Sequence, residues 1–170
     1  LEKLNDIVVD TLSKGDNELR DGMDISLCLF DYSNMEMQFA GANNSVYIFR
    51  KGIEAMETGL NGNSKFYKED LCEIKANKQP IGYYEFKKSF KNNSLKLEKG
   101  DVIYLFSDGF TDQFGGPNCK KYNVTRFRNF LLSIYDKPMA TQKRLVEKEF
   151  VSWKGDEEQI DDVIVAGIKI

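Results

Sequence analysis

The sequence contains no histidine and only three cysteines, and both shortages exclude kinds of active site. A histidine-based catalytic triad cannot form. Zinc is a poor candidate, because Cys28, Cys72 and Cys119 lack the close spacing of zinc ligands. Widely spaced cysteines are more typical of reduced, mostly buried thiols than of a disulfide framework, so we expect a cytoplasmic protein. Cys28 lies within a predicted strand, where burial accounts for a cysteine without any need for a reactive thiol.

A basic charge excess and long apolar runs are also absent. The 24 basic and 27 acidic residues leave a formal net charge of −3, which offers no surface suited to nucleic acid. No apolar stretch approaches the length of a membrane span, and the first residues do not resemble a signal peptide. We therefore expect no nucleic acid and no membrane contact by this segment. Since the chain begins without methionine, we expect it to be a piece of a longer protein.

The length and composition predict one domain over residues 1–170. Hydrophobic residues make up 41% of the chain and aromatic residues 12%, enough for a substantial core. Many hairpin strands followed by late helices indicate the α+β class, with antiparallel sheets packed against helices.

The hydrophobic periodicity predicts individual elements. Alternation predicts strands, and spacing by three or four residues predicts helices. We expect a loop over residues 58–70. The expected helices are a short one over 4–12 with its apolar stripe on a sheet, one with the stripe Phe127, Leu131 and Ile134, and one with the stripe Val146, Phe150 and Trp153, ended by Gly155. The expected strands are a hairpin over 25–39, a second hairpin with strands 46–50 and 53–57, and strands over 71–74, 102–106 and 163–170.

Two acidic turns adjoin the most apolar strands. Residues 102–106 (VIYLF) run into Ser107 and Asp108, and Gly109 permits a tight turn that aims Asp108 away from the sheet. Asp161 and Asp162 directly precede the last apolar run. If the two strands pair antiparallel, their acidic ends meet at one edge. The last strand is apolar on both faces, which predicts cover on both sides.

Four carboxylates at strand ends favour a divalent cation. Each aspartate alone, including Asp112, is well explained as a turn residue that bonds nearby backbone amides. Together they indicate a metal site, because a cation relieves the repulsion between clustered carboxylates. Oxygen-only ligation favours Mg²⁺ or Mn²⁺.

These motifs resemble a known family. Residues 104–112 (YLFSDGFTD) and 161–165 (DDVIV) resemble the last two motifs of the metal-dependent type 2C (PPM) protein phosphatases, in the bacterial branch typified by the stage II sporulation E (SpoIIE) serine phosphatases. Residues 22–27 (GMDISL), 39–44 (FAGANN) and 78–82 (KQPIG) resemble that branch's strand and turn signatures. The likeness extends from the first helix to the last residue.

The resemblance implies a fold and a site. The fold would be a four-layer α-β-β-α sandwich of antiparallel sheets flanked by helices, missing its N-terminal strands. Two Mn²⁺ or Mg²⁺ ions would lie between the sheets, with Asp108 and Asp161 as ligands and Asp112 near an accessory ion. Gly109 and Asp162 would support these ligands. A metal-activated water would attack phosphoserine or phosphothreonine, without a covalent phosphoenzyme.

The resemblance also implies what surrounds the chain. The family's upstream Gly-Asp motif, whose aspartate bridges both metals, has no counterpart here, so we expect the parent protein to be a phosphatase and this fragment to be weak or inactive. Expected partners are a phosphorylated protein substrate such as an anti-sigma-factor antagonist and an upstream sensor or regulatory domain. An edge left open by missing strands predicts a homodimer. The alternative is a non-catalytic regulatory or dimerisation module with a phosphatase-like fold.

Overall fold

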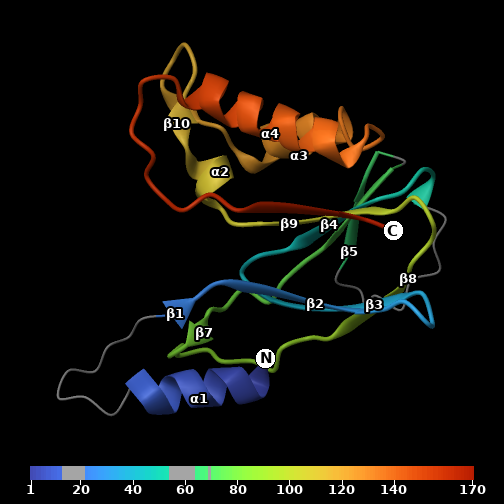
Figure 1. Cartoon of the computed structure of the whole chain (residues 1–170). Helices are drawn as coiled ribbons and strands as arrows, with labels where there is room; N and C mark the ends of the chain where they lie inside the picture. Colours follow the sequence, from blue (N-terminus) through green and yellow to red (C-terminus); the bar gives the residue numbers. More distant parts are fainter. Residues whose placement is uncertain (13–21, 54–63, 69) are drawn as a thin grey trace. The chain divides into compact units, whose positions relative to one another are not determined.

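The computed structural model describes residues 1–12, 22–53, 64–68 and 70–170 (Figure 1). These residues form two compact units. Unit 1 comprises Leu1–Val46, Met56–Lys65 and Glu73–Glu98, and unit 2 comprises Tyr47–Ala55, Phe66–Cys72 and Lys99–Ile170. Both units contain antiparallel strands and at least one helix, which confirms the α+β class.

Unit 1 is built on the predicted hairpin. Strands β2 (Ile25–Asp31) and β3 (Glu36–Ala42) pair antiparallel, and β8 (Asn93–Lys96) adds to β3. Phe39 and Met37 are fully buried and lie opposite Cys28 and Phe30. The other face of β2, which carries Leu27, is exposed. Burial raises the pKa of the Cys28 thiol to about 12, so this cysteine is not a reactive thiolate.

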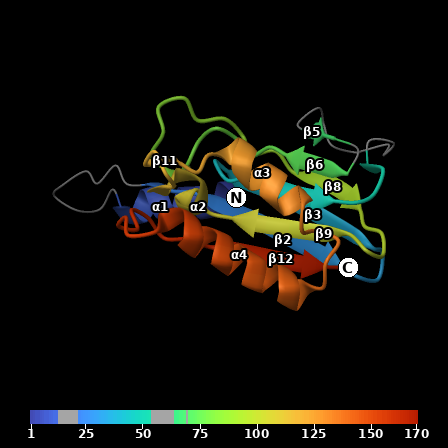
Figure 2. The same cartoon turned by 90° about the horizontal axis from the view of Figure 1, so that it is seen from above.

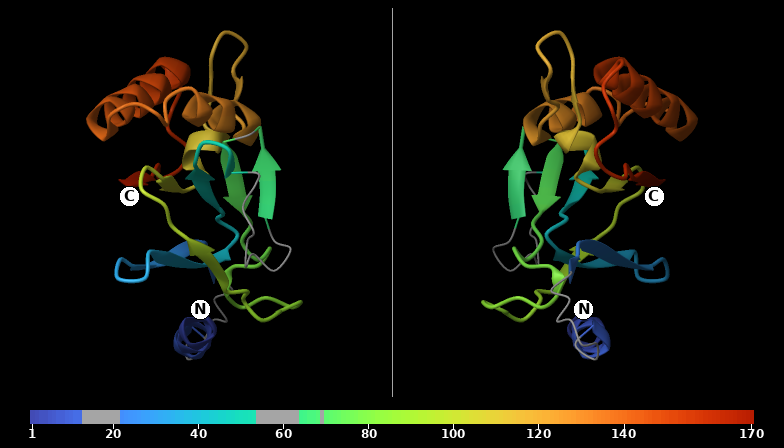
Figure 3. Two further views of the ribbon diagram at one scale, coloured as in Figure 1. Left: turned by 90° about the vertical axis from the view of Figure 1, so that its right-hand side faces the viewer. Right: turned by 90° about the vertical axis from the view of Figure 1, so that its left-hand side faces the viewer.

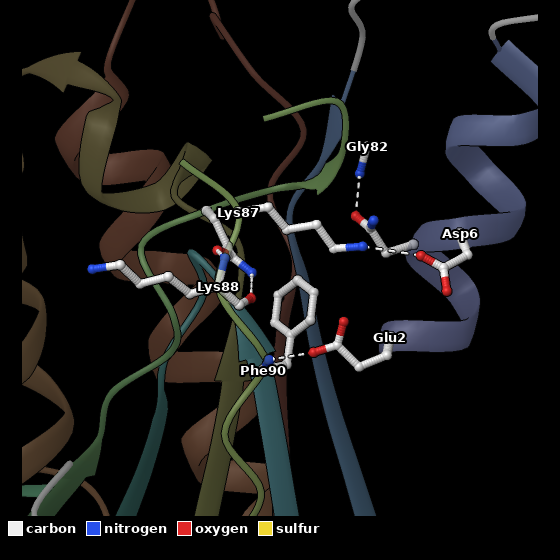
Figure 4. A network of polar contacts seen from close by, with 8 residues as sticks. Glu2, Asp6, Gly82, Lys87, Lys88 and Phe90 are labelled. Atoms are coloured by element: carbon white, nitrogen blue, oxygen red, sulfur yellow. Dashed lines mark hydrogen bonds and ion pairs between the residues drawn. The ribbon is translucent and has the colours of Figure 1, made fainter. Parts of the chain in front are cut away.

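Helix α1 (Glu2–Leu12) is confirmed, but its buried contact is polar. Asn5 is 2% exposed, and its Oδ1 accepts a hydrogen bond of 2.9 Å from the amide of Gly82. Gly82 belongs to the short strand β7 (Ile81–Gly82), which pairs with β1 (Gly22–Met23). The expected apolar stripe is only partly covered, since Ile7 is 54% exposed. Figure 4 shows two further anchors of the helix: Lys87 Nζ bonds Asp6 Oδ1 at 3.0 Å, and the Phe90 amide bonds Glu2 Oε1 at 2.5 Å.

A five-stranded sheet forms the centre of unit 2. Its order is β12-β9-β4-β6-β5. The strands are β4 (Val46–Phe49), β5 (Ser64–Tyr67), β6 (Leu71–Ile74), β9 (Val102–Phe106) and β12 (Val165–Lys169), a few of whose residues belong to unit 1. Strand β5 lies inside the segment predicted as a loop, so that prediction was wrong there. In the predicted return strand over 53–57, Ile53 lies in a short helical turn, and 54–57 fall outside the described residues.

Helices α3 (Val124–Leu132) and α4 (Met139–Lys154) cover one face of this sheet (Figures 1 and 2). Both were predicted. The side chain of Phe127 is fully buried and packs on Phe110, with ring centroids 4.8 Å apart. Helix α4 ends at Gly155, whose φ of 55° suits glycine at a helix C-terminus. None of the helices among the described residues has the length and hydropathy needed to cross a membrane.

Strand β12 lies at the edge of its sheet in the described part of the chain, and its residues are more exposed than the prediction of cover on both faces implied. Ala166, Gly167 and Lys169 are exposed, and Ile164, just before the strand, is 62% exposed. Within unit 2, α4 packs on one face of β12, and β9 is the strand that pairs with it.

A short helix, α2 (Gly109–Asp112), follows β9, and the hairpin of β10 (Phe114–Gly115) and β11 (Lys120–Lys121) projects on the helical side (Figure 3).

A buried ion pair joins the start of β9 to the end of β4. Arg50 Nε and Nη2 donate to the two carboxylate oxygens of Asp101 at 2.7 and 2.6 Å. Asp101 is 1% exposed and Arg50 9%. Two parallel charge-assisted hydrogen bonds of this kind are strong and geometrically specific.

Replacing one partner of this pair should strongly destabilise unit 2. We expect Asp101→Asn to lower the free energy of unfolding by roughly 3–5 kcal/mol, because it takes the negative partner out of a buried ion pair. Urea unfolding followed by circular dichroism measures the change. The control is Glu147→Gln in the exposed Lys143–Glu147 pair, whose atoms are 3.9 Å apart, and it should change stability by less than about 1 kcal/mol. Equal effects of the two substitutions would contradict this account.

Candidate functional site

The acidic ends of β9 and β12 lie together, as the sequence predicted. The two strands are antiparallel neighbours, with Val165 opposite Phe106. The chain therefore leaves β9 at Ser107 and Asp108 at the same end where it enters β12 after Asp162.

Ser107 joins the two chain segments through three hydrogen bonds. Its amide donates to the carbonyl oxygen of Ile164 at 3.0 Å. Its Oγ donates to the carbonyl oxygen of Asp162 at 2.8 Å and accepts from the Ile164 amide at 3.0 Å. We call this arrangement the Ser107 clamp. It holds the backbone next to Asp108 against the backbone of the acidic pair, and sequence reasoning missed it. The only signal was a hydroxyl residue between an apolar strand and an aspartate.

Gly109 is required by close approach of two backbones. It is buried at the start of α2, and a Cβ at this position would collide with the carbonyl oxygen of Asp162. The sequence predicted glycine here for its turn conformation. The structure gives a second reason, because any larger residue would separate the acidic turn from the strand entry.

Asp108 and Asp112 occupy the two ends of α2. The Asp108 carbonyl accepts from the Asp112 amide at 2.9 Å and from Thr111 Oγ1 at 2.9 Å. At the end of the helix, Asp112 Oδ2 contacts Lys121 Nζ at 2.8 Å, and both side chains are about half exposed. Asp112 thus forms an ion pair with a lysine of β11, and Asp108, which was predicted as a metal ligand, belongs to the clamped turn.

Asp161 and Asp162 are exposed at the entry to β12. Asp161 Oδ1 accepts from the Asp162 amide at 2.7 Å, and the Asp161 carbonyl accepts from Gln159 Nε2 at 2.8 Å. One oxygen of the Asp161 carboxylate is thus used to order its own turn.

The donor set suits a hard divalent cation in kind but falls short in number. Carboxylate and carbonyl oxygens are the ligands that Mg²⁺ and Mn²⁺ prefer. However, no three histidine, cysteine, aspartate or glutamate residues come close enough to hold a metal ion in the described part of the chain. The structure brings the turn that carries Asp108 and the segment that carries Asp161 to one end of the β9–β12 pair, without gathering three potential ligands among the described residues.

Comparisons with known proteins identify the fold as that of the PP2C phosphatase domains. The SiaA PP2C domain of Pseudomonas aeruginosa matches with a TM-score of 0.68 and 20% identity, over 99% of this chain and 67% of that one. The manganese-presoaked phosphatase domain of SpoIIE from Bacillus subtilis matches with a TM-score of 0.55 and 19% identity, over 100% and 66%. The catalytic domain of the phosphatase PstP, solved with two manganese ions, matches with a TM-score of 0.54 and 12% identity, over 96% and 64%.

The family follows from the sequence. The model of the stage II sporulation protein E (SpoIIE) family matches residues 1–170, so the chain belongs to this family. A search of curated proteins found no match. The chain spans about two thirds of the length of the SiaA and SpoIIE domains just named.

The close approach at Gly109 can be tested by adding one methyl group. We expect Gly109→Ala to lower the free energy of unfolding by roughly 1–3 kcal/mol, the usual cost of overpacking a well-filled position. Hydrogen exchange should accelerate at the amides of Ser107 and Ile164, because the methyl group pushes the two segments apart. Wild-type exchange at both amides would show that the approach is not tight.

Proposed function

We propose that this chain is part of a metal-dependent protein serine/threonine phosphatase. The observation that carries the proposal is the Ser107 clamp, which joins the acidic ends of β9 and β12 in a chain of the SpoIIE family. Composition supports it, since a chain without histidine or clustered cysteines depends on carboxylates for metal chemistry.

Asp108 and Asp161 are the proposed metal ligands. Two Mn²⁺ or Mg²⁺ ions are expected in the complete domain, with Asp112 near an accessory ion. Divalent cations bound there would lower the pKa of water and neutralise charge on phosphoryl oxygens. The chain's own part is to orient the carboxylates: Ser107 and Gly109 hold the two backbone segments together, and the Asp162 amide orients Asp161.

The rest of the ligand set is proposed to come from a further strand of the domain. Within the described residues, β12 pairs with β9 alone and forms the edge of its sheet. A strand added to β12 would end beside Asp161 and could deliver another carboxylate there. The 170 residues by themselves would then bind metal weakly and have little or no activity.

The proposed substrate is a phosphorylated protein in a bacterial signalling system, such as an anti-sigma-factor antagonist. The proposed setting is the cytoplasm, with an upstream sensor or regulatory domain. The three cysteines, Cys28, Cys72 and Cys119, are free thiols, which is typical of a reducing compartment and supports the proposed cytoplasmic location. A homodimer is proposed from the open edge of β12 and the exposed residues Leu27 and Leu29.

A non-catalytic regulatory or dimerisation module is the second candidate. One observation favours it, namely that no three potential ligands come together among the described residues. Calorimetric titration of the full-length protein with Mn²⁺ separates the two candidates. Binding supports the enzyme, and a flat titration favours the regulatory module.

The enzyme proposal is tested with an aryl phosphate. We expect the full-length protein to hydrolyse p-nitrophenyl phosphate only when Mn²⁺ or Mg²⁺ is present. Asp108→Asn should reduce kcat/KM by roughly 100-fold or more, since losing a ligand costs several kcal/mol and each tenfold change is about 1.4 kcal/mol.

The matched control is Asp136→Asn, which removes an exposed carboxylate from the loop between α3 and α4. The Asp136→Asn variant should hydrolyse p-nitrophenyl phosphate at the wild-type rate. Unchanged turnover in Asp108→Asn would refute the role of this aspartate.

A further inference from the structure

Gln113 is a fully buried polar residue directly after Asp112. Its backbone is held from two sides, because its carbonyl oxygen accepts from the Tyr122 amide at 2.9 Å and from Trp153 Nε1 at 3.0 Å. Tyr122 follows β11, and Trp153 lies in the last turn of α4. The position of Gln113 is therefore fixed by elements outside the acidic turn.

The side-chain amide of Gln113 reaches a distant segment. Nε2 donates to the carbonyl oxygen of Phe114 at 3.0 Å and to that of Glu158 at 2.8 Å. Both partners are acceptors, so only the nitrogen end of the amide can face them. The other end, Oε1, is buried with no hydrogen-bond partner among the described residues. The carbonyl oxygens of Phe114 and Glu158 thus determine how this amide lies.

Glu158 belongs to the segment that carries the acidic pair. Residues 155–162 connect α4 to β12, are exposed throughout and have no helix or strand of their own. Such a segment gains little order from burial and has to be held by specific contacts. Gln113 holds it at Glu158, and the Ser107 clamp holds it at Asp162. Asp161 lies between these two anchors.

We propose that Gln113 is a positioning residue that holds the segment 155–162 so that the backbone of Asp161 stays next to the turn that carries Asp108. The proposal rests on the proposed function, in which these two aspartates bind a divalent cation. Gln113 touches neither aspartate's carboxylate in this role. It acts through the backbone of Glu158, three residues before Asp161.

Gln142 provides a matched control in the same unit. It is also a buried glutamine, 1% exposed, and its Nε2 donates to the carbonyl oxygens of Tyr135 and Lys137 at 2.8 and 2.7 Å. Gln113→Met and Gln142→Met each remove an amide of similar size that bonds two backbone carbonyls. Gln142→Met also removes the acceptor of the Tyr104 hydroxyl on β9, so it should cost at least as much stability as Gln113→Met. Only Gln113→Met should release the acidic segment.

Hydrogen exchange of the full-length protein without metal is the first measurement. We expect Gln113→Met to accelerate exchange across residues 157–164 by roughly tenfold or more, while Ile103 and Ile168 in β9 and β12 remain as protected as in the wild type. Gln142→Met should accelerate exchange near residues 135–142 and leave 157–164 unchanged. Wild-type exchange of 157–164 in Gln113→Met, or equal acceleration there in Gln142→Met, would overturn the proposal.

Calorimetric titration with Mn²⁺ is the second measurement. Affinity should fall about 10-fold to 100-fold in Gln113→Met and remain unchanged in Gln142→Met. Unchanged affinity in Gln113→Met, together with a loss in Asp108→Asn, would overturn the positioning role alone. If Asp108→Asn also binds Mn²⁺ as the wild type does, the proposed function fails, and the exchange data then decide whether Gln113 orders the segment.

Discussion

The antiparallel pairing of β9 with β12 is the constraint on which the candidate site depends. It joins residues more than 50 positions apart and brings both acidic segments to one end of the strand pair. The pairing is fixed at both ends. The Ser107 clamp closes the acidic end, and at the other end the Ile170 amide donates to the Asp101 carbonyl at 3.0 Å. A shift of register by one residue would break the clamp and turn every side chain of β12 to the other face.

Buried polar side chains determine much of the geometry of unit 2. Asp101, just before β9, binds Arg50, just after β4. Gln142 bonds the loop before α4, and Gln113 bonds the segment before β12. Each contact is worth only about 1 kcal/mol net when made, but leaving a buried partner unsatisfied costs more. Such residues therefore specify one arrangement of the backbone more than they add stability. The aromatic cluster around Phe110 and Phe127 supplies the apolar burial beneath them.

The prediction from sequence succeeded where the hydrophobic residues followed a clear helical or strand pattern. The stripe of Phe127 and the run 102–106 are strong signals of a covered helix and a buried strand, and the structure has both. It failed at β5, because an edge strand with the sequence SKFY carries polar residues and shows no clear alternation. It also overstated the burial of β12, since an apolar run does not reveal how much of each side chain stays exposed. For α1, the apolar stripe concealed that the buried anchor is Asn5.

The residue composition limits the chemistry available to this protein. Without histidine, and with aspartates at the ends of its most apolar strands, the chain can offer a cation little besides oxygen ligands. Which of these oxygens come together, and what holds them, depends on contacts between distant parts of the chain. Ser107 and Gln113 act across 55 and 45 residues of chain, and no local pattern encodes contacts at such separations. They arise because packing of the sheet and helices places distant backbone carbonyls within hydrogen-bonding distance of buried donors.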